Sequence, residues 1–339
     1  MRRTSLPRLV KGLGARAAAL VLLFTVACGK DASKQSAQGS AAAGAAVAAP
    51  PAQAPIAPGD VALPASQTGG FDGAKAYEFT AKVVAFGPRP PASEGIRRAQ
   101  EYIRTQLKSF GCEIDEDDFH ASTPIGELPM KNIVAKAPGE EKGIILLLTH
   151  YDTLRMDRFV GAVDGGSSTG FMLEMARLMC GAKKQPNAVW IAFVDGEEAL
   201  VDWHSNNDNT YGSREMAAKL AATGDLKRIK AVILADLIGP KDPKFRKESN
   251  STKWLTQMVW ATAARLGYRD IFVSDEIVVD DDHIAFLNRG VPAVDIIDLE
   301  DYHYWHTLED TIDKVSPRTL GIAGHVILET VNELQKKFH

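Results

Sequence analysis

The sequence has no stripe of lysine and arginine beyond its first 16 residues. Such a stripe is the electrostatic footprint of proteins that bind nucleic acid, so we expect no nucleic-acid partner. The chain of 339 residues has 45% hydrophobic and 24% charged residues and a formal charge of −4. This composition is typical of a soluble globular protein with a substantial hydrophobic core.

The N-terminus has no acidic residue, and its apolar run, residues 17–27, is too short to span a bilayer. A basic segment, a short apolar run and small residues before Cys28 predict an export signal over residues 1–27. A buried helix is the alternative, but low-complexity sequence follows the run directly. The charges of the signal are all positive: Arg2, Arg3, Arg8, Lys11 and Arg16.

Thr25-Val26-Ala27-Cys28 resembles a lipoprotein processing site, although Thr25 stands where such sites prefer leucine. We expect a lipid on Cys28, with simple cleavage as the alternative. The mature protein would then lie in the cell envelope, in the periplasm or at the outer membrane, or be secreted. Its only membrane contact would be the lipid, and loss of residues 1–27 lowers its formal charge from −4 to −9.

Cysteine is scarce, with only Cys28, Cys112 and Cys180 in the chain. If Cys28 carries a lipid, an oxidising periplasm permits a disulfide between the other two. Two buried free thiols are the alternative, and the sequence leaves both open.

Residues 28–70 consist mainly of Ala, Pro, Gly, Gln and Ser, and residues 41–58 contain no charge and no aromatic side chain. Such a segment cannot bury a core, so it predicts a disordered tether. We therefore expect a single catalytic domain over residues 71–339.

Within that domain, unbroken apolar runs alternate with helical patterns. Runs that are apolar on both faces suit central, mostly parallel strands covered by helices. The alternation predicts an α/β fold: one doubly wound domain with a mixed, mostly parallel sheet and helices on both faces. The strands are expected at 112–121, 131–137, 143–149, 188–194, 229–237 and 292–297. The helices are expected at 74–86, 93–110, 167–181, 210–222, 251–266 and 317–338.

Polar residues follow the apolar runs at the expected carboxyl edge of the sheet, where such folds bind ligands. One acidic residue there would commonly cap a helix or face solvent. A set of carboxylates and imidazoles at one edge instead predicts a zinc site. The set comprises His150, Asp164, Glu198, Asp236 and His306.

Glu197 and Glu198 are adjacent on an extended segment, so their side chains point to opposite sides. One carboxylate can therefore bind the metal while the other faces the substrate as a proton carrier.

From about residue 75 onward the chain resembles the glutaminyl-peptide cyclotransferases of animal type, within the zinc aminopeptidase-like fold. The general pattern is carried by His150-Tyr151-Asp152, Asp164, Glu197-Glu198, Asp236 and His306. The narrower cyclase pattern is Asp195-Gly196-Glu197-Glu198-Ala199, Trp203, Tyr211-Gly212-Ser213-Arg214, Asp236-Leu237-Ile238-Gly239, Asp281-Asp282-His283-Ile284-Ala285-Phe286-Leu287 and Trp305-His306-Thr307.

The resemblance implies a role for each matching residue. One zinc ion would be held by Asp164, Glu198 and His306. Glu197 would transfer protons, with Asp236 and Asp281 in an acid network beside it. Trp203 and Trp305 would line the substrate pocket. The chain departs from the pattern at Asp280, where animal cyclases have Gln, and near Asp301, where they have a pocket Phe.

The implied reaction closes an N-terminal Gln on peptides or proteins into pyroglutamate and releases ammonia, with zinc as Lewis acid. The alternative is a dinuclear zinc aminopeptidase, in which His150 and Asp236 hold a second metal. A third reading is a tethered binding protein with a vestigial site, against which the intact Glu197 argues. We expect a monomer with one zinc per chain, or two for an aminopeptidase.

Overall fold

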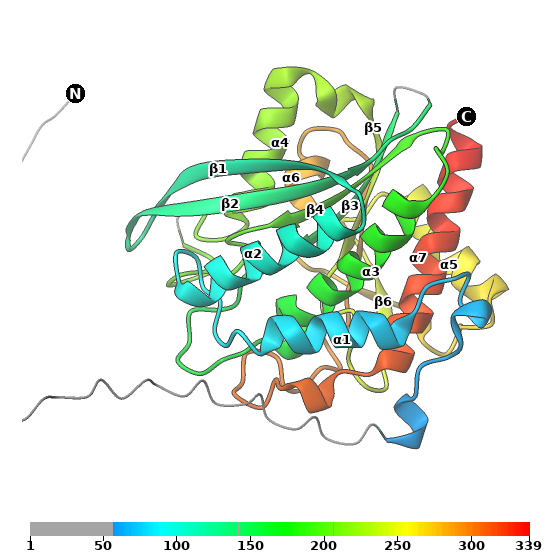
Figure 1. Ribbon diagram of the computed structural model, residues 1–339, viewed down its shortest axis with the longest axis horizontal. Helices are drawn as coiled ribbons and strands as arrows, with labels where there is room; N and C mark the ends of the chain where they lie inside the picture. Colours follow the sequence, from blue (N-terminus) through cyan, green and yellow to red (C-terminus); the bar gives the residue numbers. More distant parts are fainter. Residues whose placement is uncertain (1–56, 141–142, 206) are drawn as a thin grey trace, which may run out of the picture. The chain divides into compact units, whose positions relative to one another are not determined.

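The computed structural model describes residues 57–140, 143–205 and 207–339 (Figure 1). The expected export signal, Cys28 and residues 28–56 of the expected tether lie outside these described residues. Among the described helices, none combines the length and the apolar character needed to cross a membrane.

The tether boundary expected at residue 70 needs correction, because residues 57–70 form part of the folded unit. The segment contains two 3-10 turns, η1 (Pro58–Asp60) and η2 (Ala65–Gln67). Thr68 is fully buried, and its hydroxyl donates to the carbonyl oxygen of Phe71 at 2.6 Å. Residues 57–70 show no helical or strand-like spacing of hydrophobic residues. The sequence therefore did not predict that this segment packs against the folded domain.

The central sheet has six strands in the spatial order β1-β2-β4-β3-β5-β8. The β1-β2 and β2-β4 pairs are antiparallel, and the other three pairs are parallel. The mixed, mostly parallel sheet expected from the sequence is thereby confirmed. The strands are β1 (Glu113–Thr123), β2 (Gly126–Ala137), β3 (Ile144–His150), β4 (Ala188–Val194), β5 (Ile229–Ala235) and β8 (Ala293–Ile296).

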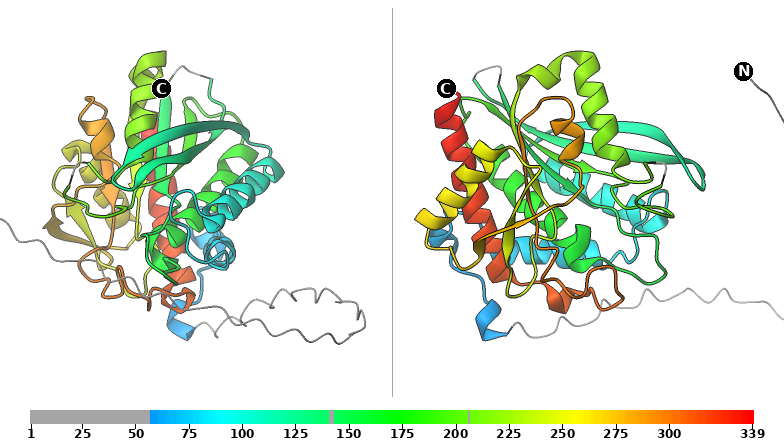
Figure 2. Two further views of the ribbon diagram at one scale, coloured as in Figure 1. Left: turned by 90° about the vertical axis from the view of Figure 1, so that its left-hand side faces the viewer. Right: turned by 180° about the vertical axis from the view of Figure 1, so that it is seen from behind.

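Helices cover both faces of this sheet (Figure 1). On β3, Ile145 and Leu147 join one buried cluster, whereas Leu146 and Leu148 join another on the opposite face. The first cluster includes α1 (Gly73–Val84), α2 (Glu94–Ser109), α3 (Ser168–Gly181), α5 (Lys253–Arg265) and α7 (Pro317–Lys337). The second includes α4 (Tyr211–Thr223) and α6 (Ile284–Leu287). Helices α5 and α7 pack side by side (Figure 2).

Polar caps define where the helices begin. Ser93, expected as an N-cap, accepts the backbone N–H of Ile96 at 3.1 Å. Ser316 accepts the N–H of Thr319 in the same way at the start of α7. Each cap satisfies an N–H that the first turn of a helix leaves without an intrahelical partner.

The sequence did not predict the second sheet, in which β6 (Phe245–Glu248) and β7 (Phe272–Ile277) pair in parallel. Both strands are short and mix charged with apolar residues. Three further short segments were also not expected: η3 (Ala162–Ser167), η4 (Asp225–Arg228) and η5 (Ile312–Lys314).

Cys112 and Cys180 form a disulfide with a Cα–Cα distance of 5.2 Å. It joins the residue before β1 to the last turn of α3. Of the two alternatives that the sequence left open, the structure contains the disulfide.

Candidate active site

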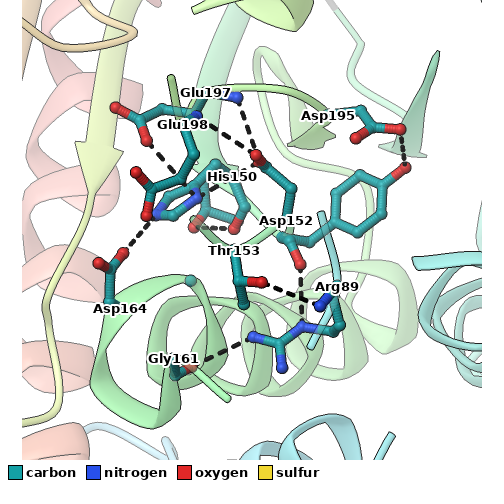
Figure 3. Close-up of polar contacts among 12 residues, drawn as sticks. Arg89, His150, Asp152, Thr153, Gly161, Asp164, Asp195, Glu197 and Glu198 are labelled. Atoms are coloured by element: carbon teal, nitrogen blue, oxygen red, sulfur yellow. Dashed lines mark hydrogen bonds and ion pairs between the residues drawn. The ribbon is translucent and has the colours of Figure 1, made fainter. Parts of the chain in front are cut away.

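The polar residues expected at one edge of the sheet do meet there. Figure 3 shows His150, Asp164, Glu197 and Glu198 together. His150 is the last residue of β3, Glu197 and Glu198 follow β4, and Asp236 follows β5. Asp164 lies in η3, just before α3. Parallel strands end at the same edge of a sheet, which is why segments far apart in the chain deliver these groups to one place.

Asp164, Glu198 and His306 form one potential metal-binding group, with ligand atoms within 4.8 Å of one another. His306 Nε2 lies 3.4 Å from Asp164 Oδ2 and 3.2 Å from Glu198 Oε2. Both carboxylates are buried, whereas His306 is half-buried in the loop after β8. The three residues expected as zinc ligands are therefore neighbours.

His150, Asp164 and Asp236 form a second group of the same kind. His150 Nε2 lies 3.4 Å from Asp164 Oδ1 and 3.0 Å from Asp236 Oδ1. The two oxygens of Asp164 thus face different histidines. Ligand positions alone are compatible with one metal ion or with two.

Unsatisfied buried atoms show that the first group fits a cation. Asp164 Oδ2 and Glu198 Oε1 are buried and have no hydrogen-bond partner among the described residues. Burial and the nearby charge of Asp164 raise the pKa of Glu198 to about 8. Although burial opposes it, the Asp164 and Glu198 carboxylates raise the pKa of His306 to about 10. Two buried carboxylates so close together need a positive charge between them, and carboxylate plus imidazole is a zinc-binding set.

Glu197 lies at the same edge, and its side chain is almost wholly buried, with 7% exposure. Its Oε2 is 3.8 Å from His150 Nδ1. Burial raises the pKa of Glu197 well above its ordinary range, although the neighbouring His150 opposes the rise. A raised pKa makes a carboxyl group a better proton acceptor than an ordinary carboxylate, which is the direction that a general base needs.

Asp152 holds the segment that carries both glutamates. Its Oδ1 accepts the backbone N–H of Glu197 at 3.1 Å, and its Oδ2 accepts that of Glu198 at 3.2 Å. Oδ1 also lies 3.5 Å from His150 Nδ1. The sequence placed Asp152 in the motif without a role, because its partners are backbone groups in the segment that follows β4.

Asp310 acts in the same way on the segment of Asp164. It accepts the N–H of Val163 at 2.8 Å and that of Asp164 at 3.1 Å. The hydroxyl of Tyr302 donates to the same carboxylate at 2.5 Å. Asp310 lies four positions after His306, so it ties the loops of two potential ligands together. Sequence reasoning missed it.

Arg89 was also missed, although it is a fully buried cation beneath the site (Figure 3). Its guanidinium donates to the carbonyl oxygens of Tyr151 at 3.2 Å, Val160 at 2.7 Å and Gly161 at 3.1 Å. Burial lowers the pKa of Arg89 to about 10, so it stays charged at neutral pH. It thereby crosslinks the loop between β3 and Asp164.

The site opens into a cavity of about 510 Å³. Trp203 and Trp305 both line it, as the resemblance implied, and Trp305 stacks on His306 with ring centroids 4.0 Å apart. Val201 and Val278, two of the most exposed apolar side chains, also line it. The cavity therefore combines a polar floor with an apolar wall.

The acids Asp236 and Asp281, expected beside Glu197, also line this cavity. Asp236 Oδ1 accepts the N–H of Leu237 at 2.7 Å in addition to its contact with His150. Burial, and then the charge of Asp236, raise the pKa of Asp281 well above its ordinary range.

The two departures from the cyclase pattern have different surroundings. Asp280 lines the cavity. Asp301 is not among its lining residues and instead pairs with Arg246 at 2.5 Å.

A buried carboxylate–imidazole set at the carboxyl edge of a mostly parallel sheet defines an α/β metalloenzyme of the aminopeptidase type. Comparison with known proteins agrees, since the model of peptidase family M28 matches residues 132–331. The chain belongs to this family, and the resemblance seen in the sequence is confirmed.

Within the family, glutaminyl cyclases are prominent among the similar proteins. The glutaminyl-peptide cyclotransferase of Boiga irregularis is 30% identical over 278 residues, covering 70% of this chain and 75% of that protein. The crystal structure of an Acidobacteriales bacterium glutaminyl cyclase has a TM-score of 0.74 and 37% identity, covering 84% of this chain and 100% of that one. A Zn-dependent exopeptidase from Parabacteroides distasonis has a TM-score of 0.70 and 28% identity, covering 77% and 98%.

Proposed function

We propose that this enzyme, a glutaminyl-peptide cyclotransferase, closes the N-terminal Gln of peptides into pyroglutamate with one zinc ion held by Asp164, Glu198 and His306. The observation that carries the proposal is the buried Glu197 carboxyl beside this ligand set, at the floor of a cavity lined by two tryptophans. The similarity to cyclases supports this activity over the aminopeptidase alternative. The zinc dependence of the similar exopeptidase supports the choice of metal.

The reaction requires no nucleophile from the protein, because the substrate supplies its own. The α-amine of the substrate attacks its own γ-carbonyl carbon, a C–N bond forms, and the bond to the amide nitrogen breaks. Nucleophile and electrophile belong to one residue, so their proximity is provided by the substrate. Bound zinc supplies Lewis-acid polarisation of the γ-carboxamide oxygen.

Glu197 moves the proton. It takes one from the attacking amine and gives it to the leaving nitrogen, which departs as ammonia. Such acid–base assistance contributes about a hundred- to ten-thousand-fold to rate. The bonds from Asp152 hold the backbone of Glu197 in place, so its carboxyl group keeps a constant position during both transfers.

The tryptophans exclude water from the reacting amide. Trp203 is half-buried and Trp305 is 45% exposed, so a bound substrate would cover apolar surface on both. Exclusion of water matters because hydrolysis of the amide competes with cyclisation.

A single zinc is supported by the hydrogen bonds of Asp236. Its Oδ1 already accepts the N–H of Leu237 and contacts His150, so this oxygen has partners without a second metal. The neighbouring Asp281 carboxyl adds an acid that can share protons with Asp236 and Glu197. We therefore place Asp236 and Asp281 in a proton network.

The deciding experiment measures two activities and the zinc content in one purified sample. Gln-peptides and aminoacyl anilides are the substrates, and zinc is counted by atomic spectroscopy. We expect ammonia release from Gln-peptides, at least about a hundredfold slower anilide cleavage, and about one zinc per chain. Anilide cleavage with two zinc ions would establish the aminopeptidase. Activity on neither substrate class would favour the binding protein.

We also propose that the enzyme is exported and carries a lipid on Cys28. The Cys112–Cys180 disulfide supports an oxidising compartment. Metabolic labelling with a radioactive fatty acid tests this, with Cys28→Ala as the control. Equal label in both proteins, or none in the wild type, would contradict lipidation.

A further inference from the structure

A second cleft of about 560 Å³ adjoins the catalytic cavity. The two share part of their lining: Trp203, His204, Asp280 and Asp281. The remaining lining of the second cleft differs in chemistry, because it is dominated by amide and guanidinium groups: Asn207, Asn209, Arg214, Asn288 and Arg289. The mechanism above uses none of these side chains.

Two cations in this cleft have no carboxylate partner. Among the described residues, no acidic side chain lies within ion-pair distance of Arg214 or Arg289. Asp280 and Asp281 in the shared wall are the acids of this cleft, and Asp282 acts on Arg214 electrostatically from beyond ion-pair distance. Two cations that line one cleft without an ion-pair partner are notable in a chain whose formal charge is negative.

Hydrogen bonds to backbone carbonyls hold both guanidinium groups. Arg214 Nη2 donates to the carbonyl oxygen of Asn209 at 2.6 Å, and its guanidinium lies over the ring of Tyr211, 5.0 Å from the centroid. Arg289 Nη1 donates to the carbonyl oxygen of Ala285 at 2.9 Å. These bonds leave Nη1 of Arg214 and Nη2 of Arg289 without a partner among the described residues. A pre-positioned guanidinium with free N–H groups favours carboxylate binding.

We propose that this cleft binds the residues that follow the N-terminal Gln and selects substrates with an Asp or Glu at position 2, 3 or 4. The inference rests on the proposed function, because a peptide whose first residue occupies the catalytic cavity must leave it along a neighbouring surface. The shared wall at Trp203 and Asp280 makes the second cleft such an exit. An extended chain advances about 3.3–3.6 Å per residue, so a few residues span a cleft of this kind.

The test compares tetrapeptide amides that begin with Gln and carry Asp, Ala or Lys at position 2, 3 or 4. At one or more of these three positions, we expect kcat/KM of the wild type to be about threefold to tenfold higher for Asp than for Lys. The difference should arise mainly from a lower KM for the Asp peptide. Salt should weaken the preference, because the guanidinium groups are partly open to solvent. Arg289→Glu should reverse it.

Arg269→Glu is the matched control, since Arg269 is exposed and lines neither cavity. Turnover of Gln-amide, which has no further residues, should be equal in both variants and the wild type. Equal kcat/KM for Asp and Lys at all three positions in the wild type would overturn the inference, as would an unchanged preference in Arg289→Glu. If the wild type failed to cyclise Gln-amide, the proposed function itself would fail.

Discussion

Asp310 accepts the backbone N–H of Asp164 at 3.1 Å, although 146 residues separate the two in the chain. Its second oxygen accepts the N–H of the preceding residue. Asp152 holds the amides of Glu197 and Glu198 in the same two-point manner. The segments that carry two proposed zinc ligands are thus held through their main chain, which restricts the ligands before any metal binds.

Glu197→Gln should abolish cyclisation and leave zinc bound. The amide keeps the size of the side chain but cannot accept the proton of the attacking amine. We expect kcat to fall by about a hundred- to ten-thousand-fold with an unchanged zinc content. Steady-state kinetics and metal analysis on the same sample check this, and near-normal turnover would show that another group carries the proton.

Asp310→Asn should weaken zinc binding, although Asp310 is not one of the proposed zinc ligands. The amide replaces one of the two acceptor oxygens with an NH2 donor, so one of the two N–H groups in the segment of Asp164 loses its acceptor. Zinc affinity should fall by about ten- to a hundredfold, as measured by competition with a chelator. Asp313→Asn is the control, because the side-chain partners of that exposed carboxylate within the described part of the chain are Thr311 and Lys314. Equal affinities in the two variants would remove the positioning role of Asp310.

Arg89→Lys should destabilise the fold, although the charge is kept. A lysine cannot reproduce the planar fork that reaches the carbonyls of Tyr151, Val160 and Gly161. We expect a loss of about 3 kcal/mol in the free energy of unfolding, measured in urea. Arg97 is exposed, so Arg97→Lys should change the free energy of unfolding by less than about 0.5 kcal/mol. Similar losses in both variants would contradict the importance of the fork.

The stability of the protein should depend on pH through Glu248, which is buried against His283 at 3.1 Å. Although burial opposes it, the bond from His283 and the backbone N–H of Asn250 lower the pKa of Glu248 to about 2 from an ordinary 4.5. A lowered folded-state pKa stabilises the fold above the unfolded-state value. The stabilising effect should therefore be complete above pH 4.5 and should disappear as the pH falls toward 2.

Glu248→Gln isolates this contribution. Above pH 4.5, the free energy of unfolding of the wild type should exceed that of the variant by about 3 kcal/mol. This difference should shrink as the pH falls toward 2. Chemical denaturation at several pH values measures it, and the exposed Glu309→Gln is the control. A difference that does not change with pH would mean that Glu248 acts through packing alone.

The apolar pattern was sufficient to predict the central strands. The run at 188–194 coincides with β4, and the run at 143–149 differs from β3 by one residue. Strands buried on both faces carry unbroken apolar sequence, so they stand out from the rest of the chain. Strands β6 and β7 were missed because they are short and mix charged with apolar residues, so neither shows an unbroken apolar run.

The sequence by itself determined the order of strands and helices and the side chains that follow each strand. Together with the rule that parallel strands end at one edge, this was enough to gather His150, Asp164, Glu198, Asp236 and His306 at one edge of the sheet. The family resemblance then singled out Asp164, Glu198 and His306 as the expected ligands of one zinc ion. Only the tertiary structure decided which carboxylates hold the backbone there, where Arg89 lies, and that Cys112 meets Cys180. Such contacts join distant segments through single polar or sulfur atoms, and no periodic pattern in the chain records them.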